Sequence, residues 1–67
     1  MTEFNIPTEV KEQLIAERLQ ALNLEGYQHE LNKKAAEAVG NLEAVVQADE
    51  AITIIKNAIT VHEQELN

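Results

Sequence analysis

The sequence predicts an all-α fold of two helices, folded as a hairpin or drawn out as one long helix, that associates into an oligomeric bundle. Three observations carry this prediction. Helix breakers are rare, with two glycines and one proline among 67 residues. Apolar residues recur at three- and four-residue spacing through most of the chain. The β-branched run Ile52–Ile55 has no second strand candidate to pair with, so helix is favoured there as well.

The N-terminal part of this single small domain, residues 1–67, is expected to lead into a long helix. Residues 1–6 read as a loose lead-in, and residues 8–39 read as helical. Proline suits a first helical turn, as Pro7 would provide, and Thr8 is a residue type that caps helices. Acidic residues close behind complement the helix dipole.

The two glycines have different expected roles. Gly26 is expected inside a continuous helix, at a cost of about 1 kcal/mol, because the apolar spacing continues across it. A break there would give a third helix. Gly40 followed by Asn41 is typical of a helix stop and restart, yet the apolar phase survives here too. A turn at 40–41 and an unbroken helix both remain open, ahead of helical residues 42–66.

The last segment has an unusually wide apolar face. On a helical wheel at about 100° per residue, its apolar side chains fill a continuous half-circle of about 180°. They are Ala51, Ile52, Ile54, Ile55, Ala58, Ile59, Val61 and Leu66. One neighbouring helix covers a narrower strip. We therefore expect two or more neighbours, one being the chain's own first helix and the others coming from a second copy or another protein.

A seven-residue apolar repeat, which we call the heptad series, runs through both halves of the chain. Such a repeat is typical of helices packed along their lengths. Most repeats also have a second apolar position. It lies four residues after the first in the early repeats and three residues after it beyond residues 45–48, as at a stammer or a turn. With its companions Ile55 and His62, the series forms the predicted interaction face: Leu24, Leu31, Ala38, Val45, Ile52, Ile55, Ile59, His62 and Leu66.

The histidines are assigned structural rather than chemical roles. His62 lies at the centre of the last apolar face, which favours a hydrogen-bonded packing residue over a pH switch or metal ligand. His29 lies on the polar side of its stripe and is expected in solvent. Glu25 and His29 have the i,i+4 spacing of a metal-binding pair, but two ligands on an exposed helix are too few. We predict no catalytic, cofactor-binding or metal-binding residues and no enzymatic activity.

Size and composition point to association. A chain of 67 residues buries only about 60% of its unfolded surface. The absence of cysteine excludes disulfides and thiolate zinc sites, and the aromatic content of 3% leaves a core of small aliphatic side chains. Below about 70–80 residues a chain with such a core usually needs a disulfide, a metal ion or a partner chain for stability. The expected partners are further copies of the chain, in a homo-oligomer, or another protein.

Charge narrows the partners further. Five basic against twelve acidic residues give a net charge of −7, which argues against nucleic acid and anionic membranes. No basic-then-apolar leader is visible and no 18 apolar residues run together, so we expect a cytoplasmic protein of a bacterium or an infected host cell. An alternative function is an acidic decoy that blocks a basic nucleic-acid-binding protein. A bundle that depends on a ligand or metal is a third.

Residues 35–59, "AAEAVGNLEAVVQADEAITIIKNAI", resemble the C-terminal half of the small helical chaperones with which T4-type phages assemble trimeric tail fibres. In both, a helix ends in Ala-Val-Gly, here at Gly40, an acidic pair such as Asp49-Glu50 starts a helix, and that aliphatic helix contains Lys56-Asn57. The extra apolar "LEAVV" departs from the family pattern. The resemblance implies a non-enzymatic, oligomeric folding helper and transfers no functional residues.

Overall fold

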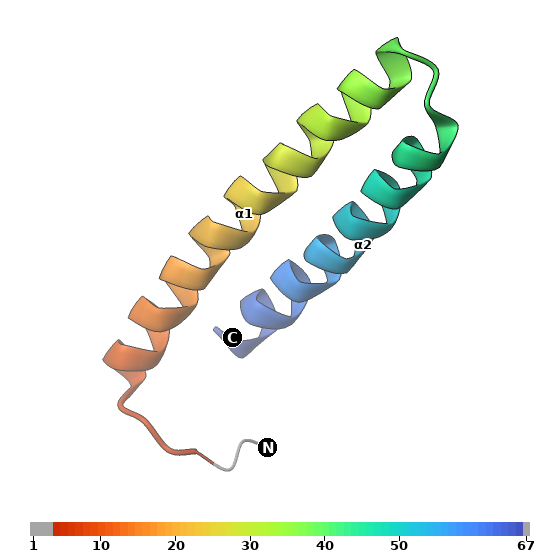
Figure 1. Ribbon diagram of the computed structural model, residues 1–67. Coiled ribbons are helices and arrows are strands. Elements are labelled where there is room, and N and C mark those ends of the chain that lie inside the picture. Colours follow the sequence, from red (N-terminus) through yellow and green to blue (C-terminus); the bar gives the residue numbers. More distant parts are fainter. Residues whose placement is uncertain (1–3, 67) are drawn as a thin grey trace.

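The computed structural model describes residues 4–66, which form a hairpin of two antiparallel helices (Figure 1). Helix α1 spans Thr8–Ala38 and helix α2 spans Leu42–Glu65. They lie side by side, so that the start of α1 and the end of α2 come to the same end of the molecule (Figure 1). The prediction of an all-α hairpin is confirmed. The alternative of one long helix does not form.

Helix α1 begins directly after Pro7. The carbonyl of Pro7 accepts the first helical hydrogen bond, from the backbone N–H of Lys11 at 2.9 Å. Pro7 occupies the N-cap position, where no side chain caps the helix. The expected capping role of Thr8 is therefore wrong, because Thr8 is already the first helical residue. Of the predicted lead-in, residues 4–6 are non-helical, as is Pro7 after them, and residues 1–3 lie outside the described part.

The connection between the helices is a turn centred on Gly40. The Gly40 N–H donates to the carbonyl of Glu37 at 3.2 Å, and the Asn41 N–H donates to that of Ala36 at 2.9 Å. These two hydrogen bonds are typical of a helix that ends at a residue in the left-handed conformation. Gly40 is that residue, with a φ of +71°. Asn41 then starts α2, because its Oδ1 accepts from the Ala44 N–H at 3.2 Å. Local chemistry thus both ends α1 and starts α2.

The two helices share a thin core. Four side chains are buried within the described residues: Ile15, Ala36, Ala48 and Ile55. Helix α1 continues through Gly26, as expected, and a Cβ added there would lie 3.5 Å from Cγ2 of Ile55. Gly26 therefore leaves room for the isoleucine between the helices. The result is a rod of 49 × 19 × 16 Å whose core is one layer of side chains.

Candidate interaction surface

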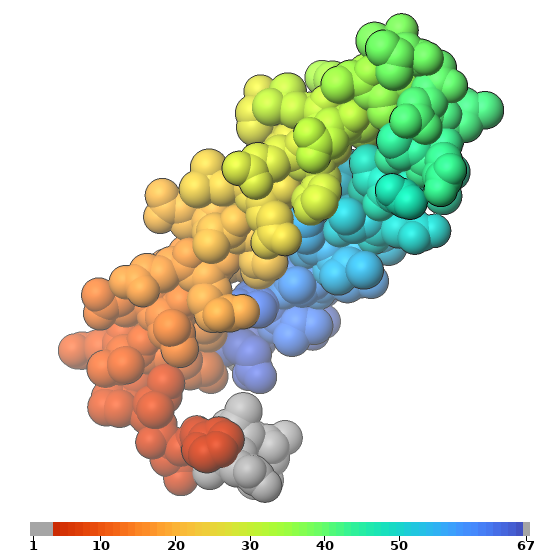
Figure 2. All heavy atoms as spheres, in the orientation of Figure 1, coloured from red at the N-terminus to blue at the C-terminus, as the bar shows by residue number. Residues whose placement is uncertain are grey.

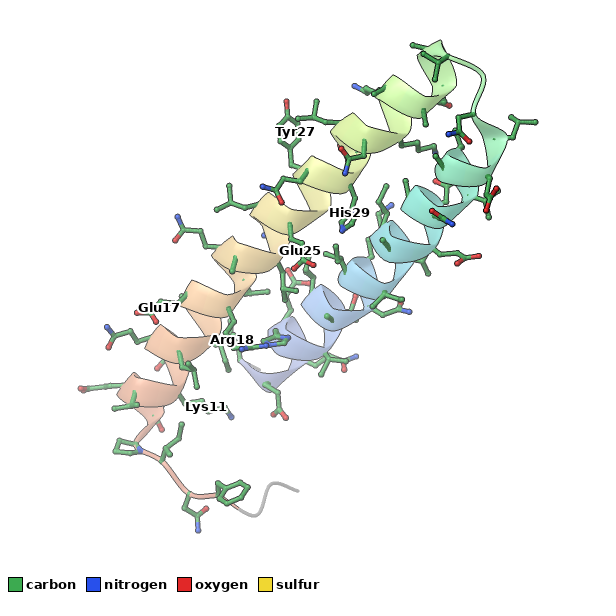
Figure 3. All side chains as sticks on the ribbon, viewed as in Figure 1. Lys11, Glu17, Arg18, Glu25, Tyr27 and His29 are labelled. Atoms are coloured by element: carbon green, nitrogen blue, oxygen red, sulfur yellow. The ribbon has the colours of Figure 1, made fainter. Side chains whose placement is uncertain are left out.

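The predicted interaction residues of α1 lie on the side of that helix facing away from α2. Leu24 is 62% and Leu31 47% exposed, and Ala38 is exposed as well. At about 100° per residue, Leu31 lies about 160° around the helix from the buried Ile15. Figure 3 shows the neighbouring Tyr27 pointing away from α2, whereas Arg18 and His29 point toward it.

Most of the predicted interaction residues of α2 lie on the side of that helix that faces α1. Ile55 is buried against α1. Four others are half-buried along the contact with α1: Val45, Ile52, Ile59 and His62. Leu66 follows the end of α2 and is exposed. The heptad series therefore does not form one surface in the hairpin, because the turn at Gly40 reverses the chain and presents a different side of α1 to α2.

Sequence reasoning missed the side of α1 that does contact α2. It consists of a second set of residues seven apart, Ile15, Leu22, His29 and Ala36, all buried or half-buried. The spacing is a signal that was available in the sequence. The set is obscured because the basic residues Lys11, Arg18 and Lys33 share its side of the helix. The expectation that His29 lies in solvent is consequently wrong, since it is half-buried beside α2 (Figure 3).

His62 uses both of its ring nitrogens, one within α2 and one to reach α1. Nδ1 lies 2.6 Å from the carbonyl oxygen of Ala58, and Nε2 lies 3.0 Å from Nε of Arg18. Since the Arg18 N–H can only donate, Nε2 accepts, and the proton is assigned to Nδ1, which donates to Ala58. His62 is thus a hydrogen-bonded packing residue of the hairpin, the structural role expected from its position.

Two ion pairs align the helices near their ends. Nζ of Lys33 lies 2.7 Å from Oδ1 of Asp49, and Nζ of Lys11 lies 4.0 Å from Oε2 of Glu65. The hydrogen bond to Asp49, and then its negative charge, raise the pKa of Lys33 above the ordinary 10.5. Exposed ion pairs of this kind contribute little to stability in general, so they favour this alignment rather than hold the fold together.

The outward side of α1 carries a long apolar strip, which we call the outer seam. Its members follow alternating four- and three-residue spacing: Val10, Leu14, Glu17, Ala21, Leu24, Gln28, Leu31, Ala35 and Ala38. All nine are exposed in the hairpin, and seven are apolar. A mean spacing of 3.5 residues is that of a helix packed in a two-stranded coiled coil.

Helix α2 also retains uncovered apolar side chains. Ile54 is 68% and Val61 55% exposed, on the flank of α2 beside the contact with α1. The described residues form two helices, packed as the narrow rod of Figure 2. Helix α1 therefore covers part of the 180° apolar face and leaves the rest open. This incomplete cover is what the width of the face predicts.

The described residues form open grooves, and one of about 400 Å³ lies between the residues before α1 and Leu14, Ile15 and Glu65. A shallow groove of about 280 Å³ lies beside Gly26, with Leu22, Ile52, Ile55 and Ile59 among its walls. Among residues 4–66, no three histidine or acidic side chains gather as a metal site would require. Neither described helix has the length and apolar character needed to cross a membrane.

No family model matches this sequence, and no curated protein or solved structure is significantly similar to it.

Proposed function

We propose that this protein is a non-enzymatic interaction protein, an accessory or assembly factor that works by self-association and by presenting helical surfaces to another protein. One observation carries the proposal. The described residues bury four hydrophobic side chains, two of them alanines, while thirteen large hydrophobic residues remain exposed. More large hydrophobic side chains are thus exposed on the described hairpin than are buried within it.

The energetics of a two-helix unit support association. A fully buried isoleucine contributes about 1.5–3 kcal/mol, and the hairpin buries only Ile15 and Ile55 in this way. Ordering the backbone costs about 1–2 kcal/mol for every residue. Helices gain most of their stability from packing of an apolar face rather than from propensity. Burial of the exposed residues against a second molecule supplies what one hairpin lacks.

The more specific role is that of an assembly chaperone in the cytoplasm of a bacterium or phage-infected cell. Its support is the resemblance of residues 35–59 to the tail-fibre chaperones of T4-type phages. That segment spans the end of α1, the Gly40 turn and most of α2. A helper of this kind needs exposed apolar helix surface rather than a catalytic site.

The first test is sedimentation equilibrium combined with circular dichroism over a dilution series. We expect a mass that is a multiple of 7.5 kDa and a helicity that falls on dilution. A fully helical 7.5 kDa monomer at every concentration would overturn the proposal.

A pair of variants locates the surface. Leu24→Glu places a charge on the outer seam and should weaken association while leaving the hairpin helical when dilute. Asn23→Glu adds the same charge one residue earlier, off the outer seam, and is the matched control. Equal effects of the two substitutions would mean that added charge, rather than the outer seam, controls association.

A further inference from the structure

We infer that the outer seam of α1 pairs with the outer seam of a second copy, antiparallel, in the register that sets Leu14 opposite Leu31 of the second copy. This inference rests on the proposed self-association and adds its geometry. The outer seam extends from residue 10 to residue 38, a length of about 40 Å at 1.5 Å per residue.

The two polar residues of the outer seam select this register. With Leu14 opposite Leu31 of the second copy, Glu17 lies opposite Gln28 of that copy, and by symmetry Gln28 lies opposite its Glu17. The Gln28 amide N–H then donates to the Glu17 carboxylate, so each polar group meets a partner. Polar residues at such positions set the register of coiled coils.

Other antiparallel registers lose this match. A shift by one seven-residue repeat sets Glu17 opposite an alanine, either Ala21 or Ala35. Gln28 then meets Val10 or Leu24. A buried polar group without a hydrogen-bond partner is destabilising, and each shifted register contains such groups twice because the pair is symmetric.

A parallel arrangement is disfavoured by charge. Two parallel helices in register set identical residues against each other, so that the Glu17 carboxylates of the two copies meet within the outer seam. Like charges held close and shielded from water repel strongly. The antiparallel pair separates the two carboxylates and gives each one an amide.

Side-chain size fits the same register. Ala21 lies opposite Leu24 of the second copy, and Val10 lies opposite its Ala35. Each alanine therefore faces a larger side chain, and alternation of large with small residues fills the space between helices without voids.

The distribution of charge favours α1 as the self-association element. Four of the five basic residues lie on α1, namely Lys11, Arg18, Lys33 and Lys34, against six acidic residues of that helix. Helix α1 therefore contributes −2 to the net charge of −7. Two copies meeting through α1 repel each other less than they would through the rest of the chain.

Disulfide cross-linking tests the pairing directly, since the natural chain contains no cysteine. Val10→Cys and Ala35→Cys are made as separate proteins, both at exposed positions outside the hairpin contact. A disulfide needs Cα atoms about 4.4–6.8 Å apart. In the proposed register Cys at position 10 meets Cys at position 35 of the other copy, while identical positions are about 37 Å apart along the helix.

We expect mild oxidation of the mixed variants to give the heterodisulfide, identified by its mass, with little cross-linking of either variant alone. Asn23→Cys mixed with Val10→Cys is the control for random collision. Efficient cross-linking of each variant with itself would overturn the inference in favour of a parallel pair. An oligomer by sedimentation without the heterodisulfide would overturn the inference but leave the proposed function standing, and a monomer would overturn both.

Discussion

Adjacent isoleucines on α2 allow the stability of the hairpin to be separated from its association. Ile55 is 6% exposed and packs over Gly26, whereas Ile54 is 68% exposed. Truncation of a buried isoleucine to alanine costs about 2–5 kcal/mol, the lower values being found where the site can relax. The groove beside Gly26 opens to solvent, so we expect Ile55→Ala to cost about 2–3 kcal/mol.

The assay is thermal unfolding followed by circular dichroism, at a concentration where sedimentation shows one molecular species. A loss of about 1 kcal/mol lowers the melting temperature of a 60–100-residue domain by about 4–8 °C, so Ile55→Ala should lower it by about 10–20 °C. Ile54→Ala removes the same atoms from an exposed site and should change the stability of the single hairpin by less than about 0.5 kcal/mol. Equal destabilisation of the dilute hairpin by both substitutions would refute the assignment of Ile55, rather than Ile54, to the contact with α1.

Four further predictions follow from single features. Gly40→Ala should cost about 1–2 kcal/mol in chemical denaturation, because alanine is strained at a φ of +71° although nothing lies within 4 Å of the added Cβ. His62→Phe retains an aromatic ring but loses both hydrogen bonds of the imidazole. It should therefore reduce hydrogen-exchange protection in the last turns of α2. Lys33→Gln should lower the melting temperature slightly at neutral pH, where the protonated lysine pairs with Asp49. Since folding raises the pKa of Lys33, this difference should persist below pH 10.5 and vanish as the pH rises through the raised pKa. Glu17→Leu should strengthen association by sedimentation yet relax its orientation, so that Val10→Cys in that background cross-links with itself.

Local residues determine the ends of the helices, and the start of α1 at residue 8 was predicted, whereas the turn at Gly40 and Asn41 was one of two interpretations that the sequence left open. Pro7 cannot continue a helix backward, and Gly40 with Asn41 supplies both a left-handed C-terminal residue and a capping side chain. These effects act within a few residues of the chain. Such signals survive whatever the rest of the molecule does.

The side of α1 that contacts α2 was not predictable in the same way, because α1 has two apolar strips with a seven-residue period. The outer seam contains Leu24 and Leu31, whereas the strip through Ile15 and Leu22 contacts α2. In the sequence, the strip that contacts α2 resembles a polar surface because lysines lie beside it on the helix. Lys33 nevertheless places its ammonium group on an acid of α2, and the aliphatic stem of a lysine packs well along apolar surface.

The strip of α1 that contacts α2 depends on how the two helices pair after the turn. The periodicity of one helix alone carries no information on that pairing. The wide face of α2 was a better guide, because its width is independent of the partner. The apolar face of α2 is wider than one neighbouring helix can cover, and the uncovered part includes the exposed Ile54 and Val61.

The reversal at Gly40 makes the molecule suitable for a distance measurement between its two ends. In the hairpin, dyes attached at the start of α1 and at the end of α2 lie at the same end of a 49 Å rod (Figure 1). If the turn straightened into one helix over residues 8–65, the ends of that helix would be about 87 Å apart at 1.5 Å per residue. Energy transfer between such dyes therefore reports, in single molecules, whether a bound partner keeps the hairpin closed or opens it.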